Sequence, residues 1–118
     1  MQEEIFGPLL PIKPYQNFDD VVNYINQGQK PLAVYYFGDS YHADSVRLKD
    51  QTSSGAYVTN ECIVQMTSHY TGFGGVGDSG SGRYGGWEGY CNFTNRKAAL
   101  FKGPVAAAMR SLTMPPYT

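Results

Sequence analysis

A chain of 118 residues, of which 42% are hydrophobic and 16% charged, can form one domain with one modest core. The formal net charge is -1 and no basic patch or stripe is visible, so the composition disfavours nucleic acid as a partner. No apolar run approaches the roughly 20 residues that span a bilayer, and the acidic start, MQEEIFGP, is unlike a secretory signal.

The first two predicted elements are a short strand and a helix. The run at 9–12, LLPI, is apolar and interrupted by proline, which is typical of a strand at the edge of a sheet. Asn17 stands as a helix N-cap, two aspartates follow in the first turn, and Gly28 provides a stop. Between them, one helical face is formed by apolar residues at helical spacing: Phe18, Val21, Val22 and Ile25.

Two further strands and a second helix are predicted next. Residues 32–37, LAVYYF, form a continuous apolar and aromatic run, which is typical of a strand covered on both faces. Asp39 or Ser40 can cap a helix over 41–50, and a third strand is predicted within 56–64. The order strand, helix, strand, helix, strand predicts an α/β fold with a parallel sheet and right-handed crossovers.

The glycine-rich segment 73–86, FGGVGDSGSGRYGG, dominates the second half of the chain. It holds seven of the fourteen glycines, which predicts a tight loop held by its neighbours. Before it, 66–72 has no regular pattern, and the pattern of 87–93 does not decide its structure. A last strand is predicted at 98–101, AALF, and a short helix over 104–112.

Two short motifs within the glycine-rich segment resemble functional fingerprints. The GxGxxG match at 75–80 lacks the preceding apolar strand and the following helix of a dinucleotide-binding site, so it does not indicate phosphate binding. The run GDSG at 77–80 resembles the sequence around the nucleophilic serine of chymotrypsin-like proteases. A short α/β chain is incompatible with their double β-barrel, so a serine hydrolase is disfavoured.

The histidines and cysteines are the remaining candidates for chemistry. We expect His42 to be solvated in the first turn of the second helix and His69 to be a surface or hydrogen-bonding residue. Cys62 is expected to be a small core residue of the third strand, and Cys91 to pack likewise. Because CxxC spacing is missing, we expect neither a disulfide framework nor a metal site, and we expect a reducing intracellular compartment, cytoplasmic or organellar matrix.

Five blocks of the sequence, taken together and in order, match the pattern of a known family. They are QEEIFGPLLP at 2–11, KPLAVYYF at 30–37, SSGAYVTN at 53–60, FGGVGDSGSG at 73–82 and TNRKAAL at 94–100. Together they resemble the C-terminal part of the aldehyde dehydrogenases, and most closely the class-three or fatty aldehyde branch. The resemblance implies that 1–93 is part of a Rossmann-like catalytic domain. It implies that 94–118 holds an oligomerisation strand, 98–101, and a C-terminal tail.

The same resemblance implies which residues contact ligands. The second glutamate of EEIFGP, here Glu4, would hold the hydroxyls of the nicotinamide-side ribose of NAD or NADP, and Phe6 would pack beside the nicotinamide ring. A carboxylate accepts two hydroxyl protons and an aromatic face supports a flat ring, so both roles are chemically sensible. Gln65, His69 and Phe73 would lie toward the substrate channel.

The resemblance assigns no catalytic residue to this chain. The family's nucleophilic cysteine, general-base glutamate and oxyanion-holding asparagine precede EEIFGP, as does its cofactor-binding domain. Three positions also depart from the family pattern, since Gln65 stands where class three usually has histidine, Gly72 replaces a proline and Gly85 a histidine. Relatives can carry methionine at the position of Met1 inside longer chains, so we expect this sequence to start mid-protein.

Two interpretations remain open. In the first, the chain is the C-terminal segment of an NAD(P)-dependent aldehyde dehydrogenase, which oxidises an aldehyde to a carboxylic acid through a cysteine thioester, and it is inactive alone. In the second, it is a non-catalytic, aldehyde-dehydrogenase-like structural or interaction subunit. Both interpretations imply a partner, either the remaining half of the dehydrogenase or another protein chain, in a dimer or a larger assembly.

Overall fold

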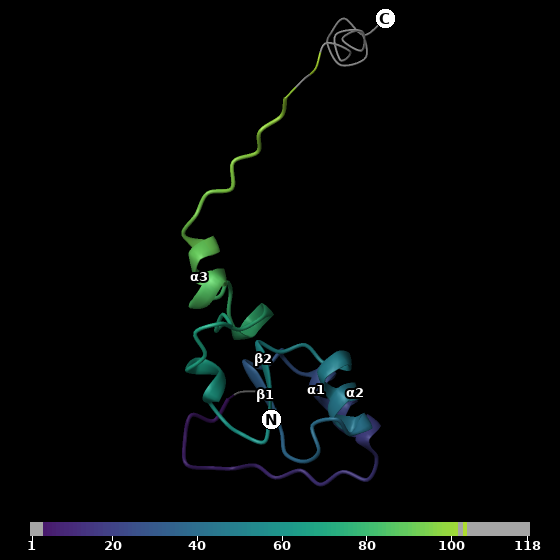
Figure 1. The fold of residues 1–118 in the computed structure, drawn as a ribbon. Helices are drawn as coiled ribbons and strands as arrows, with labels where there is room; N and C mark the ends of the chain where they lie inside the picture. Colours follow the sequence, from purple (N-terminus) through teal and green to yellow (C-terminus); the bar gives the residue numbers. More distant parts are fainter. Residues whose placement is uncertain (1–3, 102, 104–118) are drawn as a thin grey trace, which may run out of the picture.

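A computed structural model of the protein describes residues 4–101 and 103. The helices and strands are α1 (Phe18–Gln27), β1 (Ala33–Tyr36), α2 (Ala43–Gln51), β2 (Ala56–Thr59) and α3 (Gly86–Asn92), with the short 3-10 turns η1 (Val64–Met66) and η2 (Gly77–Ser79). Figure 1 shows α1 and α2 side by side next to the sheet, with α3 set apart from them. Within the described residues, no helix is long and apolar enough to cross a membrane.

The two strands form a parallel sheet, as the sequence predicted. Ala33 pairs with Ala56 and Tyr36 pairs with Thr59, so β1 and β2 run in the same direction and in full register. Helix α2 makes the crossover between them, which is the α/β arrangement. In the described part of the chain the sheet has two strands, so each strand keeps one edge without a ladder partner.

The core lies between this sheet and the two helices. Its buried apolar side chains are Val22 from α1, Val34 from β1 and Leu48 from α2. Around them pack the partly buried residues Phe18, Val21, Ile25, Tyr36 and Tyr57. The predicted apolar face of α1 is therefore the face that packs on the sheet. Partial burial raises the pKa of the Tyr36 phenol, and the nearby Asp44 carboxylate adds to the effect.

Leu48 should be the most sensitive aliphatic position of this small core, because it is only 4% exposed. We expect Leu48→Ala to lower the free energy of unfolding by about 2–4 kcal/mol, through lost burial and the cavity left behind. Val46 on the same helix is 41% exposed, so Val46→Ala should cost well under half as much. Urea unfolding followed by circular dichroism measures both, and equal losses would contradict the packing described.

The predicted strand at 9–12 is wrong for the described chain. Residues 4–15 contain no strand, and their apolar side chains face outward, with Leu10 84% and Ile12 85% exposed. The three prolines at 8, 11 and 14 remove backbone donors from the segment, and no neighbouring strand supplies acceptors for the rest. This stretch runs around the edge of the domain before α1 begins (Figure 1).

The third predicted strand is shorter than expected. It ends at Thr59, because Asn60 has a left-handed backbone with φ 59° that an extended ladder cannot continue. Cys62 consequently lies outside the strand and is exposed, which corrects its expected place in the core. The second helix also begins later than expected, and its cap is His42, whose ring accepts a hydrogen bond from Asp44 N at 3.2 Å.

The glycine-rich segment docks on the amino-terminal end of the sheet. Gly55, which precedes β2, is buried and donates its N–H to Pro31 O at 3.1 Å. A Cβ at Gly55 would collide with the carbonyl oxygens of Gly74 and Leu32, so these backbones touch where only glycine fits. The loop is closed by an antiparallel bridge between Phe73 and Tyr84, whose rings lie 5.4 Å apart.

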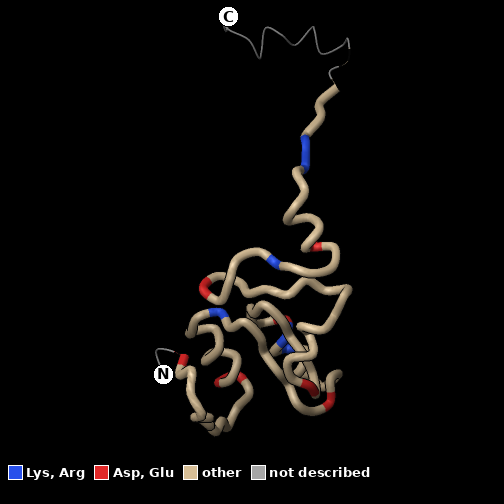
Figure 2. Tube along the Cα trace, turned by 90° about the vertical axis from the view of Figure 1, so that its left-hand side faces the viewer, with Lys and Arg blue, Asp and Glu red and all other residues tan. Residues whose placement is uncertain are grey.

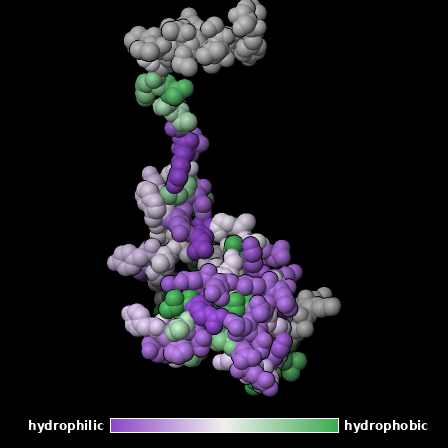
Figure 3. All heavy atoms as spheres, turned by 90° about the vertical axis from the view of Figure 1, so that its right-hand side faces the viewer, coloured by the Kyte–Doolittle hydropathy of each residue, from purple (hydrophilic) through white to green (hydrophobic). Residues whose placement is uncertain are grey.

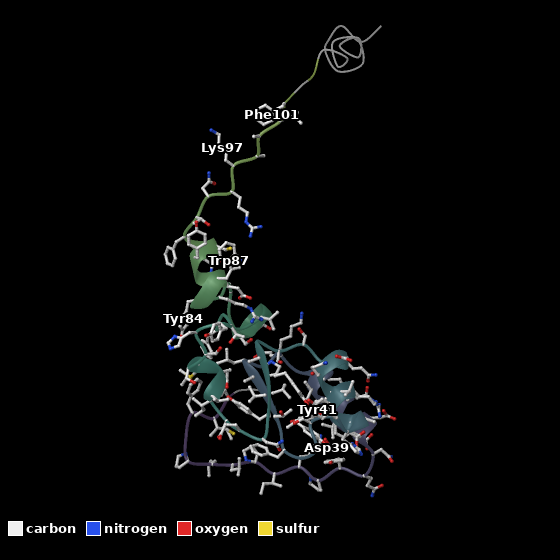
Figure 4. All side chains as sticks on the ribbon, viewed as in Figure 1. Asp39, Tyr41, Tyr84, Trp87, Lys97 and Phe101 are labelled. Carbon is white, nitrogen blue, oxygen red and sulfur yellow. The ribbon has the colours of Figure 1, made fainter. Side chains whose placement is uncertain are left out.

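The segment after the loop forms a helix and then an extended arm. Residues 86–92 are helical (α3), which the sequence pattern had left undecided. Figure 1 shows residues 94–101 running away from the body of the domain, and Figure 4 places Lys97 and Phe101 on this arm. The predicted strand at 98–101 is not formed within the described chain, because a strand needs a ladder partner and none lies beside it. The predicted helix over 104–112 lies outside the described residues.

The surface differs sharply between sides of the domain. Figure 3 shows that the side carrying α1 and α2 is mostly hydrophilic, and Figure 2 shows charges scattered along the trace. Elsewhere many large apolar side chains are exposed, on the segment before α1, around η1 and on the arm after α3. They include Phe6, Leu9, Leu10, Ile12, Ile63, Val64, Met66, Leu100 and Phe101. Such a surface is unusual for a domain that stands alone in water.

Candidate functional site

The carboxyl ends of β1 and β2 are held together by one asparagine. Asn60 Oδ1 accepts a hydrogen bond from Gly38 N at 2.8 Å, and Asn60 Nδ2 donates to Gly38 O at 2.9 Å. Ser40 Oγ adds a third link, since it donates to Thr59 Oγ1 at 2.9 Å. Ligands of open α/β sheets bind at the carboxyl ends of the strands, so this clamp fixes the edge where a site is expected.

Gln65 lies just beyond this edge and contacts the sheet. Its Nε2 donates to the Tyr35 hydroxyl at 2.7 Å, and Ile63 N donates to the same oxygen at 3.4 Å. Gln65 Oε1 is buried and has no hydrogen-bond partner among the described residues. An amide oxygen in this condition is rare in a folded protein and calls for a partner.

The turn that presents Gln65 is strained. Ile63 has φ 68°, a left-handed backbone that costs a β-branched residue of order 1–3 kcal/mol. It precedes η1, in which Gln65 is the middle residue. Strained backbone of this kind is concentrated at functional sites, so the observation supports a role for the η1 turn.

The predicted cofactor residues lie on the segment before α1. Glu4 is exposed, and Phe6 is 89% exposed with a left-handed backbone at φ 46°. Both side chains are thus available to a ligand or to another chain. The described hydrogen bonds and ring contacts join neither of them to Gln65 or Phe73.

The other two predicted channel residues belong to the glycine-rich region. His69 is exposed, and its carbonyl oxygen would lie 3.0 Å from a Cβ built at Gly86. Phe73 is half-buried against Tyr84. The structure therefore brings His69 and Phe73 to the α3 end of the domain and Gln65 to the sheet, rather than all three into one enclosed cavity.

Two of the three departures from the family pattern fit their surroundings. The Glu88 side chain lies over Gly72, where a Cβ would come within 2.9 Å of Glu88 Cβ. Gly85 is the N-cap of α3 and has φ 85°, a conformation that glycine adopts freely. Glu88 also lies 3.5 Å from Arg83 Nε, so a charge pair holds the loop to the first turn of α3.

Two open hollows lie away from most of these residues. One of about 680 Å³ lies between α1 and the segment before it, where Lys13 Nζ stands 3.7 Å from the centre of the Tyr24 ring. The other, of about 430 Å³, lies between the glycine-rich loop and α3, where Trp87 stacks on Tyr90 with ring centres 5.0 Å apart. Neither is lined by Glu4, Phe6 or Gln65.

Comparison with known proteins identifies the family. The model of the aldehyde dehydrogenase family matches residues 1–99. The chain belongs to the aldehyde dehydrogenase family. Among the curated relatives of this family member is a probable coniferyl aldehyde dehydrogenase of Pseudomonas aeruginosa, 43% identical over 117 residues, which are 99% of this chain and 24% of that protein. Human aldehyde dehydrogenase family 3 member B1 is 42% identical over 118 residues, 100% of this chain and 25% of that protein.

A solved structure supports the fold of this aldehyde dehydrogenase. The substrate-bound state of Staphylococcus aureus AldH superposes with a TM-score of 0.75 at 35% sequence identity, covering 99% of this chain and 25% of that one. The α/β fold predicted from the sequence is therefore confirmed at the level of its class. The chain spans about a quarter of the length of the relatives it matches.

Sequence reasoning missed two residues of the site. The apolar run 32–37 predicts a strand position for Tyr35 and nothing more, although a half-buried tyrosine hydroxyl needs a hydrogen-bond partner. Asn60 enters the sequence prediction only within the block at 53–60, although asparagine directly after a strand is a signal for a left-handed turn. Both signals were present in the sequence.

Proposed function

We propose that this chain is the C-terminal segment of the catalytic domain of a class-three-like, NAD(P)-dependent aldehyde dehydrogenase. The whole enzyme would oxidise an aldehyde to a carboxylic acid through a cysteine thioester, with the nucleophile and the cofactor-binding domain supplied upstream. In this proposal residues 1–93 complete the catalytic domain and residues 94–118 serve subunit contacts, inside the cell.

The observation that carries the proposal is the one-sided parallel sheet. Helices α1 and α2 pack on the face that carries Val34 and Tyr57. The opposite face carries Ala33, Tyr35, Ala56 and Val58, which are only half-buried. Parallel sheets are normally covered on both faces and continue beyond two strands, so the missing layer and strands would come from the rest of an aldehyde dehydrogenase.

The cofactor residues fit this proposal chemically. The exposed Glu4 carboxylate has acceptor capacity for two ribose hydroxyls, and the exposed Phe6 ring offers a flat face to a flat ring. A bound NAD or NADP would supply the hydride acceptor for the oxidation. Glu4 and Phe6 would orient that group, while the upstream part of the enzyme would provide the remaining contacts.

The substrate is proposed from the similarity to the curated relatives. Several relatives are named for coniferyl aldehyde, so this aldehyde is the first substrate to test, beside a medium-chain alkyl aldehyde. Gln65, His69 and Phe73 would face the substrate in the complete enzyme, where upstream chain would close over them.

The proposal is tested by activity of the chain alone and in a chimera. The purified chain with NAD or NADP and either aldehyde should show no turnover. A chimera in which this chain replaces the matching 117 residues of the Pseudomonas aeruginosa relative should oxidise the aldehyde. Turnover by the chain alone would overturn the segment proposal. A folded chimera that binds cofactor without turnover would instead favour the non-catalytic subunit.

A further inference from the structure

The smaller of the two hollows, between the glycine-rich loop and α3, holds one of the two cysteines of the chain. Cys91 lies on α3, is half-buried and lines this hollow of about 430 Å³. A hollow of this size is typical of sites that bind small molecules. The other cysteine, Cys62, is exposed and lines neither hollow. The two thiols therefore differ in their surroundings as well as in their exposure.

A guanidinium group lies against the thiol of Cys91. The chain turns directly after α3, where Thr94 N and Thr94 Oγ1 donate to Cys91 O at 3.3 and 3.2 Å. The turn brings Arg96 back to the hollow, and its Nη2 lies 3.6 Å from Cys91 Sγ. Among the described residues no carboxylate pairs with Arg96, whereas Arg83, which also lines the hollow, is paired with Glu88. The other N–H donors of Arg96 are therefore available to an oxygen atom of a bound molecule.

An indole ring lies beside the thiol on the same helix. Trp87 and Cys91 are four residues apart on α3, a spacing that puts both side chains on one helical face. Trp87 lines the same hollow and is 69% exposed, so most of its surface is free to contact another ring (Figure 4). The Tyr90 ring stacks on it with ring centres 5.0 Å apart, which supports its orientation. The hollow therefore combines a thiol, a cation and an aromatic surface.

We propose that Cys91 is a covalent modification site for aryl α,β-unsaturated aldehydes. The aryl ring stacks on Trp87 and the carbonyl oxygen accepts a hydrogen bond from Arg96, which places the β-carbon beside the sulfur. Reactive cysteines lie in partly exposed, electropositive surroundings of this kind. The hollow is lined by none of the residues proposed to contact cofactor or substrate, so the inference goes beyond the proposed function and does not depend on turnover.

The reaction is an addition in which nothing is oxidised or reduced by a third molecule. Cys91 gives its thiol proton to solvent, and Sγ forms a bond to the β-carbon. The electron pair of the C=C bond moves toward the carbonyl oxygen, where the Arg96 guanidinium stabilises the developing negative charge. The α-carbon then takes a proton from solvent and the aldehyde group is restored. The adduct therefore carries the mass of one whole aldehyde molecule.

Mass spectrometry of the folded 118-residue chain treated with cinnamaldehyde tests the inference, with Cys62 as the internal control. Exposure alone would make Cys62 the faster thiol. We expect Cys91 to be labelled at least about tenfold faster, because the hollow adds a charge-assisted hydrogen bond and a ring contact. In urea the two rates should become similar, because the hollow is lost. Equal or faster labelling of Cys62 in the folded chain, or a preference for Cys91 that persists in urea, would overturn the inference.

Two pairs of variants separate the cation from the ring. Arg96→Gln should slow the labelling of Cys91 by about tenfold, whereas Lys97→Gln, which removes the same charge without a hydrogen bond to the aldehyde, should stay within about twofold. Trp87→Leu should slow labelling by cinnamaldehyde by about threefold or more and leave crotonaldehyde, which has no ring, within about twofold. Phe93→Leu, at a ring that does not line the hollow, should affect neither aldehyde. A variant of the hollow that behaves like its control would contradict the proposed contact.

The chimera with the Pseudomonas aeruginosa relative tests the same site within a complete enzyme. The peptide that carries Cys91 should gain the same adduct as in the 118-residue chain. Its absence from a folded chimera would overturn the inference, because upstream chain would then cover the hollow. A chimera that is labelled at Cys91 but does not oxidise aldehydes would count against the proposed function alone.

Discussion

Replacing Gly55 by alanine should destabilise this domain by at least about 3 kcal/mol, which is large for the addition of one methyl group. The new Cβ would collide with the carbonyl oxygens of Gly74 and Leu32 and come within 2.9 Å of Gly75 Cα. All three are backbone atoms, which cannot swing aside as a long side chain can. The glycine-rich segment would have to leave the end of the sheet.

Urea unfolding of the 118-residue chain measures the effect, with Trp87 fluorescence as a probe of the loop, since Trp87 and Gly75 line the same hollow. Gly28→Ala is the matched control, because its Cβ would lie at ordinary contact distances of 3.6 and 3.8 Å, and its φ of -88° suits alanine. The control should change stability by no more than about 1 kcal/mol, and in the stabilising direction. Similar behaviour of the two variants would contradict the docking of the loop on β2.

Neutralising Glu4 should have the largest effect on cofactor use. In the chimera, Glu4→Gln should lower kcat/KM for NAD or NADP by about 10–100-fold, since it replaces charge-assisted hydrogen bonds to the ribose by weaker neutral ones. The loss should appear mainly as a raised KM for the cofactor, with KM for the aldehyde little changed. Steady-state kinetics with the cofactor varied at saturating aldehyde measures it.

Glu3→Gln is the matched control for this prediction, because it removes the same charge from the neighbouring position of the EEIFGP block. We expect the control to lie within about twofold of the unmodified chimera, because the proposal assigns no ligand contact to Glu3. Equal losses in the two variants would mean that Glu4 acts through general charge and does not hold the ribose.

The sequence predicted those elements whose pattern is local. The apolar spacing of α1 packs its expected face on the core, and the LAVYYF run contains β1. The parallel order of β1 and β2 followed from the helix between them, which is long enough to cross over. These features depend on residues that are close in the sequence, which is why a single sequence was enough to predict them.

The predictions that failed concern residues that are far apart in the sequence or groups that lie outside the chain. The run at 9–12 is apolar enough for a strand but has no ladder partner in the described chain, and the hydrogen bonds between Asn60 and Gly38 join residues that are 22 positions apart. The prediction that Cys62 lies in the core depends on a strand that reaches 64, whereas β2 ends at Thr59. The contact between Tyr35 and Gln65 joins residues 30 positions apart, so no local pattern could have placed it.

Mixing the purified chain with a truncated Pseudomonas aeruginosa relative that lacks its matching 117 residues tests the central claim most directly. Aldehyde oxidation should be absent from either chain alone, should appear on mixing, and should saturate at equimolar amounts, with light scattering recording a joint particle. The account is contradicted if the folded chain neither binds the truncated relative nor restores its turnover.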